Sequence, residues 1–486
     1  MTPKPSMRRN LVVGLGIALL AGVTVLTHRP KDDVASVRTD PSPPRSPAAP
    51  NPILRRSLVV GLVFAVLAGV TVLVHRHTDD VIMVAYWYFG VTVIAVCLVS
   101  FVIGRRFTKN PIAPGRVLCI VPAYNEDPEG LRKTVIALLQ QTVTVDIVVI
   151  DDGSQIRVVP SVIHPRVQWR WQKNTGKRGA QVAVLKEFHR STYQFILTVD
   201  SDSTPYPDAC EQLLRAMHNP KVQAATGMIY IRNYGESWVT FAADLDIGTS
   251  CVMMRASRSM LGALETTSGA LALYRSELLY DHLDAYAVEC GTGDDRWLAL
   301  RALRRGQVVA VAEALVETDM PRTLKGTYKQ RLRWSRSWWW MLPYVGKYLG
   351  FRQCMSPVYG VIQLLVAPVM VFYIVASTVA THAGRYTTHD TYILLAYVAA
   401  YVVVRYALSA LYLMERPNVS LRDKCKLFLF GTPAAVMLNV GLLTPTRYVA
   451  LAKLFDNRWQ TRELSAGQLA ALSKSDHLAP ASEAVA

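Results

Sequence analysis

Long apolar runs occupy both ends of the chain, and a mixed polar and apolar region lies between them. Before residue 104 the runs lie at 11–27, 58–74 and 81–103. The first two are about 17 residues long, near the lower limit for crossing a bilayer. The third begins near Tyr86, Trp87 and Tyr88, which suit the membrane–water boundary. We predict two transmembrane helices within 55–104.

Three further apolar runs follow the central region, near 357–380, 391–413 and 426–455. The last contains Pro433 and Pro445, so it forms either one kinked span or two short pieces. We expect transmembrane and interfacial helices throughout 346–462, and a disordered Ala/Ser-rich tail at 463–486.

A direct repeat relates the first two apolar runs. Residues 8–34 and 55–81 match at 20 of 27 positions, including His-Arg at the same offset. Shared hydrophobicity alone does not reproduce that pair, so the pattern indicates a duplication. A proline-rich stretch after the first copy predicts an extended linker, giving an N-terminal extension over 1–54. Both ends of the first copy are basic, which leaves open whether it spans the membrane.

Basic residues beside the apolar runs predict the orientation of the protein. Arg105, Arg106 and Lys109 follow the third run, and Arg55 and Arg56 precede the second. Positive charge marks the cytosolic side, so we place the central region in the cytosol, together with the basic loop at 416–426.

The central region, 105–345, alternates short β-branched runs with helical patterns. Strands are predicted at 117–121, 146–150 and 195–199, and helices at 129–141 and 177–188. This alternation is typical of an α/β domain with a mostly parallel sheet covered by helices.

Composition narrows the class of protein. The chain is 51% hydrophobic with a net charge of +17, too apolar for a purely soluble protein. Its basic residues flank apolar runs and acidic clusters instead of forming one block, which favours lipid headgroups and a diphosphate over nucleic acid. The seven cysteines are scattered without metal-ligand spacing, as expected in a reducing cytosol.

Polar clusters follow the predicted strands, where ligands bind in open α/β sheets. They lie at 122–126, 151–153 and 200–202. Asp200 and Asp202, one residue apart in a loop, can converge on Mg²⁺ or Mn²⁺ and neutralise a nucleotide diphosphate leaving group. A solvated turn is the plainer interpretation of that pair, and the neighbouring motifs argue against it.

Two later groups can add positive charge and a base to a site that binds a nucleotide diphosphate. Lys177 and Arg178 stand at a predicted helix start and can add positive charge near phosphates. Asp294 and Asp295 open a helical run, where the helix dipole favours an ionised carboxylate that can act as a base. An ordinary acidic N-cap is the commoner use of such residues. The aromatic stretch 334–340 suits an interfacial helix or a stacking platform for sugar rings.

These motifs together resemble the processive family 2 glycosyltransferases with a GT-A fold, especially bacterial hyaluronan synthases and rhizobial chitooligosaccharide synthases. The resemblance covers about residues 57–462 and ends on NRWQTR at 457–462. It rests on the motifs VPAYNE (121–126), DDGS (151–154), NTGKRGAQ (174–181), VDSDS (199–203, the DSD loop), TSGALALYR (267–275), GDDR (293–296) and QRLRWSRS (330–337). The last begins with a QxxRW pattern at 330–334.

The resemblance implies a role for each motif. Asp295 would be the general base of an inverting, β-forming transfer, and Asp202, with Asp200, would bind the metal. The donor UDP-sugar would be held by Tyr124, Glu126, Asp152, Lys177, Arg178, Asp200, Asp202, Gln330, Arg333 and Trp334. The acceptor would contact Ser268, Gly269, Asp294, Arg296 and Trp334.

Three positions depart from the pattern of hyaluronan synthases. Thr266 stands where a cysteine is usual, Ala270 where a proline is usual, and Trp297 is bulkier than expected. The first two weaken hyaluronan as the product, since this region shapes the acceptor pocket.

The leading hypothesis is a multi-pass plasma-membrane enzyme that extends a polysaccharide in the cytosol and secretes it across the bilayer. It would use UDP-N-acetylglucosamine and UDP-glucuronic acid. A chitin or poly-N-acetylglucosamine synthase using one donor is the alternative. A non-processive transferase to a lipid phosphate would need no QxxRW motif, so the motif at 330–334 argues against that class. A transporter with a nucleotide-sensing domain would need no Asp295 beside a metal pair, so Asp295 argues against a non-enzymatic protein.

Overall fold

The computed structural model describes residues 52–77, 81–104, 106–291, 293–382 and 388–455. The first repeat copy and most of the proline-rich segment lie outside the described residues. So do the NRWQTR motif and the C-terminal tail.

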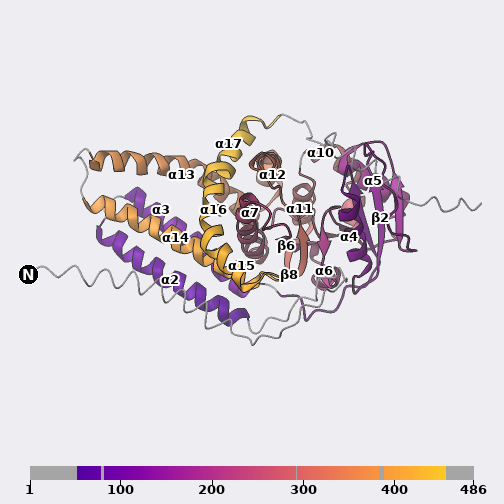
Figure 1. The fold of residues 1–486 in the computed structure, drawn as a ribbon, viewed down its shortest axis with the longest axis horizontal. Coiled ribbons are helices and arrows are strands. Elements are labelled where there is room, and N and C mark those ends of the chain that lie inside the picture. Colours follow the sequence, from indigo (N-terminus) through magenta and orange to yellow (C-terminus); the bar gives the residue numbers. More distant parts are fainter. Residues whose placement is uncertain (1–51, 78–80, 105, 292, 383–387, 456–486) are drawn as a thin grey trace, which may run out of the picture. The chain divides into compact units, whose positions relative to one another are not determined.

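A mixed sheet lies at the centre of the domain that follows the first two helices (Figure 1). Its order among the described residues is β3-β2-β1-β4-β7-β6-β8-β5. The strands are β1 (Val117–Ala123), β2 (Val145–Asp151), β3 (Val167–Trp171), β4 (Phe195–Thr198), β5 (Thr204–Pro205), β6 (Val222–Ile231), β7 (Ala272–Arg275) and β8 (Gln307–Thr318).

The expectation of a mostly parallel sheet is correct for only part of it. Strands β3, β2, β1 and β4 are mutually parallel, as are β6 and β8. Strand β7 is antiparallel to β4 and β6, and β5 is antiparallel to β8. Antiparallel pairing needs no helical crossover, and a short buried run looks the same in either direction, so the sequence pattern did not separate the two.

Helices cover both faces of this sheet. They are α4 (Pro128–Leu139), α5 (Gly176–Glu187), α6 (Ala209–Met217), α7 (Trp238–Gly248), η1 (Thr249–Met254), α8 (Arg255–Met260), α9 (Ser276–Tyr280), α10 (Leu283–Glu289), α11 (Asp294–Arg305) and α12 (Leu324–Tyr348). The predicted helices at 129–141 and 177–188 are confirmed within two residues as α4 and α5.

Alternation along the strands produces two apolar cores. Leu118 and Ile120 of β1 belong to one core, whereas Cys119 and Val121 belong to the other. Successive side chains of a strand point to opposite faces, so one buried run supplies both layers. The carboxyl ends of β1, β2 and β4 lie at the edge of these two cores, and each is followed by a polar loop.

Apolar helices flank this domain in the chain. They are α2 (Pro52–His77), α3 (Val81–Ile103), α13 (Phe351–His382), α14 (Thr388–Glu415), α15 (Leu421–Lys426), η2 (Leu427–Gly431), α16 (Thr432–Leu438), η3 (Asn439–Leu443) and α17 (Thr444–Ala452). By length and composition, three stretches of the described residues can cross a membrane: Arg55–Arg76, Val398–Glu415 and Leu421–Ala452. Helix α2 packs against α3 and α14 (Figure 1).

The stretch Leu421–Ala452 is one continuous helical path interrupted by two π-helical turns. The turn η2 lies just before Pro433 and η3 just before Pro445. Proline cannot donate a backbone hydrogen bond, and a wider turn before it accommodates the missing donor. Of the two expectations for this run, the structure has a single interrupted helix.

A buried ion pair joins the end of α14 to helix α7 of the domain that contains the sheet. Arg416 Nη2 lies 3.3 Å from Asp244 Oδ1 on α7, and the Tyr412 hydroxyl donates to the same oxygen over 3.0 Å. Both charged side chains are almost fully buried. Helix α7 therefore connects the apolar helices to the domain that carries the site.

Candidate active site

A cavity of about 510 Å³ opens at the carboxyl ends of β1, β2 and β4, with α11 and α12 along its other walls. It brings together almost every residue singled out from the sequence. These are Tyr124, Glu126, Asp152, Lys177, Asp200, Asp202, Ser268, Gly269, Asp294, Asp295, Arg296, Gln330, Arg333 and Trp334. Arg178 does not line the cavity: its Nη1 donates to Cys290 Sγ over 3.1 Å.

The loops after β1 and β2 are locked to each other. The backbone N–H of Asn125 donates to Ser154 Oγ over 2.9 Å, and Gln155 N–H donates to Asn125 Oδ1 over 2.8 Å. Asn125 adopts φ 51°, a conformation that asparagine tolerates better than most residues. Gly153 has φ 76°, and a Cβ there would lie 2.6 Å from the backbone nitrogen of Asn174. The DDGS motif thus needs its glycine for a close approach.

The two aspartates of DDGS have different surroundings. Asp151 accepts hydrogen bonds from the backbone of Ser154 and Val158, each over 2.9 Å, and so shapes its own loop. Asp152 lines the cavity and accepts from Thr175 N–H over 2.9 Å and Gln172 Nε2 over 2.7 Å. These donors hold its carboxylate at the cavity edge.

Lys177 joins two parts of the site that are distant in the chain. Its Nζ lies 2.7 Å from Asp200 Oδ1 and 3.2 Å from Asp294 Oδ2. Burial alone would lower the pKa of Lys177, but the two carboxylates raise it well above the usual value. Gly269 packs against this group, because a Cβ there would lie 2.7 Å from Asp200 Oδ2.

Asp294 and Asp295, at the start of α11, differ in their electrostatic environment. Burial raises the pKa of Asp295 and the neighbouring Asp294 charge adds to that effect, so the pKa reaches about 7. Burial also opposes ionisation of Asp294, but the Lys177 ion pair outweighs it and lowers the pKa of Asp294. The pair therefore holds one firmly ionised carboxylate and one that exchanges its proton near neutrality.

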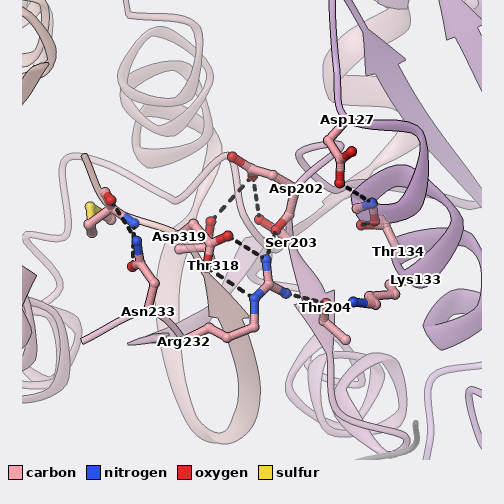
Figure 2. Close-up of polar contacts among 12 residues, drawn as sticks. Asp127, Lys133, Thr134, Asp202, Ser203, Thr204, Arg232, Asn233, Thr318 and Asp319 are labelled. Carbon is pink, nitrogen blue, oxygen red and sulfur yellow. Dashed lines mark hydrogen bonds and ion pairs between the residues drawn. The ribbon is translucent and has the colours of Figure 1, made fainter. Parts of the chain in front are cut away.

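Asp202 is oriented by the ends of β6 and β8. Figure 2 shows Thr318 and Ser203 donating to Asp202 Oδ1, each over 3.3 Å. Arg232 Nη2 donates to the backbone oxygen of Asp202 over 3.0 Å and pairs with Asp319. Sequence reasoning missed Arg232, Thr318 and Asp319, because no local pattern relates the ends of these two strands to the DSD loop.

The acidic residues of the cavity fit a divalent cation. Asp200 and Asp202 present hard oxygen ligands, and no group of three or more His, Cys, Asp and Glu suited to a metal occurs among the described residues. Mg²⁺ is commonly held by one or two carboxylates together with substrate phosphates and water. The two carboxylates of Asp200 and Asp202 are therefore enough protein ligands for such an ion if a substrate diphosphate supplies further oxygen ligands.

Helix α12 closes the cavity with Gln330, Arg333 and Trp334, and it lies against the start of α11. A Cβ on Gly293 would overlap Ser337 Oγ and lie 2.5 Å from Ser337 Cβ. The glycine of GDDR thus allows the two helices to meet.

The three tryptophans that follow on α12 have separate environments. Trp339 Nε1 donates to the Arg447 backbone over 2.9 Å, Trp338 lies against Gly360, and the Trp340 ring is near Phe455. They do not share one face of the helix, as expected from its geometry. None of the three lines the cavity, whereas Trp334 does.

The remaining positions are explained by their surroundings. Thr266 and Ala270 both line the cavity, so these departures from the expected pattern lie at the site. Trp297 faces the core instead, with the Arg301 guanidinium over its ring. Arg296 Nη1 lies 3.3 Å from the buried Glu265 carboxylate, so this residue is partly neutralised.

A family model and two related proteins indicate the same family. Residues 114–337 match the family model described as glycosyltransferase like family 2. An N-acetylglucosaminyltransferase of Sinorhizobium fredii is 30% identical over 373 residues, covering 72% of this chain and 84% of the relative. A hyaluronan synthase of Streptococcus pyogenes serotype M1 is 27% identical over 366 residues, covering 72% and 83%. Among solved structures, a mannosyltransferase of Pyrobaculum calidifontis with GDP-Man and Mn²⁺ has a TM-score of 0.42 at 18% identity, covering 81% of this chain and all of its own.

We expect Gly293→Ala to lower kcat/KM by about 10²-fold, because it forces α11 away from α12 and a displacement near 1 Å can cost that much. Adding Ser337→Gly should restore most activity, since the nearest remaining atom, the Cα of residue 337, lies 3.6 Å from the new Cβ. Gly235→Ala is the control, with no atom within 4 Å of its Cβ. An active Gly293→Ala enzyme, or no rescue by the second change, would contradict this account.

Proposed function

The chain belongs to the family 2 glycosyltransferases, and we propose that it is a membrane-embedded, processive, inverting β-glycosyltransferase. It polymerises UDP-sugars into an extracellular polysaccharide. We propose hyaluronan, built from UDP-N-acetylglucosamine and UDP-glucuronic acid, as the product. Similarity to a hyaluronan synthase over most of the chain supports this choice.

The observation that carries the proposed chemistry is the contrast between Asp294 and Asp295. A general base is most effective when its pKa is near the working pH, and that of Asp295 is about 7. Asp294 stays ionised beside Lys177 and keeps the proton affinity of Asp295 high. Both carboxylates face the cavity that carries Asp200 and Asp202.

In the proposed step, Asp295 accepts the proton of an acceptor hydroxyl. The hydroxyl oxygen attacks the anomeric carbon of the donor sugar from the face opposite the nucleotide. The new C–O bond forms as the bond to the diphosphate breaks, and the electron pair leaves with UDP. The anomeric configuration therefore inverts.

Residues of the first half of the sheet would bind the donor. We assign Tyr124, Glu126 and Asp152 to the uridine, because all three lie together at the ends of β1 and β2. Lys177 and Arg333 bring positive charge toward the diphosphate. Arg178 adds charge from the start of α5 at longer range. Gln330 and Trp334 would cover the donor from α12.

We propose that Asp200 and Asp202 hold Mg²⁺ or Mn²⁺. When bound, the ion would neutralise charge developing on the diphosphate leaving group. Arg232 and Thr318 keep the DSD loop in place for this task.

The acceptor would lie on the other side of Asp295. Trp334 is 37% exposed and offers an aromatic face for a sugar ring. Ser268 and Gly269 form the floor near Asp200, with Asp294 and Arg296 beside them. Thr266 and Ala270 shape the same wall and so influence which sugar is accepted.

The apolar helices support a membrane location. We propose a multi-pass protein of the plasma membrane with the catalytic domain in the cytosol and the polymer leaving along the helices. Three candidate spans and the basic residues at 105–109 support this arrangement.

A polymer of N-acetylglucosamine alone is a second possible product, and similarity to another relative supports it equally. The Sinorhizobium fredii relative is an N-acetylglucosaminyltransferase. A chitin-type or poly-N-acetylglucosamine synthase that uses UDP-N-acetylglucosamine alone is therefore the alternative.

We expect Asp295→Asn to abolish polymer formation, a loss of at least about 10²-fold, because the acceptor hydroxyl keeps its proton. UDP affinity, measured by calorimetry, should be largely unchanged.

In the parent enzyme kcat/KM should fall as the pH drops below about 7, since protonated Asp295 cannot act as a base. Activity of the Asp295→Asn variant within about threefold of the parent would exclude Asp295 as the general base.

Removal of divalent cations should stop the reaction. We expect a chelator to abolish UDP release, and Mg²⁺ or Mn²⁺ to restore it. Asp202→Ala should weaken both metal activation and donor affinity, because the diphosphate charge is left uncompensated. Full activity in excess chelator would show that the metal assignment is wrong.

The product is tested with membranes supplied with defined donors. UDP-N-acetylglucosamine and UDP-glucuronic acid together should produce a hyaluronidase-sensitive polymer, and either alone should give at most a few sugars. Long chitinase-sensitive chains from UDP-N-acetylglucosamine alone would replace hyaluronan with the alternative product. A changed pocket wall shifts sugar preference by ~1–3 kcal/mol, so Thr266 and Ala270 make this the decisive assay.

A further inference from the structure

We propose that Asp246 is a positioning residue that sets the length of the polymer by holding Arg331 against Trp334. This inference rests on the proposed polymerase function and adds Asp246, a residue that the sequence patterns did not single out. Asp246 lies on α7 and does not line the cavity, whereas Arg331 and Trp334 do.

An ion pair with little solvent access links α7 to the QxxRW helix. Arg331 Nη2 lies 2.9 Å from Asp246 Oδ2, and the side chains are only 14% and 10% exposed. A partly buried pair is screened less by water and salt than a surface pair, so it restrains the arginine more firmly.

The restrained arginine lies against the proposed sugar platform. Its guanidinium carbon is 4.7 Å from the centre of the Trp334 ring. A planar guanidinium stacks on an aromatic face and limits its rotation. Trp334 is one helical turn from Arg331, so the same helix segment carries both. Asp246 thereby orients the exposed ring without touching the sugar.

The other carboxylate oxygen of Asp246 connects to the C-terminal helix. Asn439 Nδ2 donates to Asp246 Oδ1 over 3.3 Å, and Asn439 is the first residue of the π-helical turn η3. Helices α12 and α17 also pack against each other. The orientation of Trp334 is therefore coupled to the position of an interrupted candidate membrane span.

A loosened Trp334 weakens the grip on the acceptor between successive additions. The nascent chain then dissociates sooner, and products become shorter. Loss of general folding would instead reduce every step together.

The test compares purified parent enzyme with Asp246→Asn, Asp246→Glu and Arg331→Lys, with polymer length measured on gels and initial UDP release measured in parallel. We expect Asp246→Asn to shorten products at least fivefold, with a much smaller fall in the initial rate of UDP release. Asp246→Glu should restore much of the length. Arg331→Lys keeps the charge but loses the planar stack on Trp334, so it should also give short products. This variant tests the inference independently if Asp246→Asn does not fold. Asp423→Asn, in an exposed ion pair with Lys426, is the control and should leave length unchanged.

A double variant, Asp246→Asn with Arg331→Lys, should be no shorter in product than the worse of these two single variants, because both changes disturb one contact. Multiplicative effects, or an equal fall of length and UDP release, would overturn the inference. So would normal product length in both Asp246→Asn and Arg331→Lys. A parent enzyme that makes no polymer from any UDP-sugar would refute the proposed function, and this inference with it.

Discussion

The ammonium group of Lys177 is the contact on which the candidate site depends. It lies between Asp200, from the loop after β4, and Asp294, from the start of α11. This position draws the two acidic segments together and keeps Asp294 ionised, and the Asp294 charge adds to burial in raising the pKa of Asp295. Because the group is tightly packed, Gly269 has no room for a side chain. One cation thus contacts or influences the proposed metal ligands, the proposed base and the floor at Gly269.

Helix α7 performs a comparable task between the domain and the apolar helices. Asp244 pairs with Arg416 at the end of α14, and Asp246 pairs with Arg331 on α12 and contacts Asn439. Two buried acids on one short helix therefore contact three other segments. Removing one partner of a buried pair leaves an uncompensated charge and costs about 3–5 kcal/mol, so these contacts define the arrangement strongly.

In the proposed function, the wall formed by Thr266 and Ala270 influences which sugar is accepted. Thr267, which lies between them in the chain, donates to the backbone oxygen of Asp295 over 3.1 Å. A change in this wall can therefore affect both the choice of sugar and the position of the proposed base. Relatives of the chain are named both as an N-acetylglucosaminyltransferase and as a hyaluronan synthase.

The sequence by itself determined the family, the α/β class with its GT-A-like fold, and many of the residues that line the cavity, whereas it missed Thr318 and Asp319 and wrongly included Arg178. Strand periodicity located the carboxyl ends of β1, β2 and β4, and polar motifs at those ends are a local signal. Tertiary structure alone decided that β7 runs antiparallel, that Arg178 turns toward Cys290 and that Arg232 supports Asp202. It also decided the pairing of Arg331 with Asp246, 85 residues away. Such contacts depend on which elements pack together, and no local pattern of hydrophobic and polar residues encodes that choice.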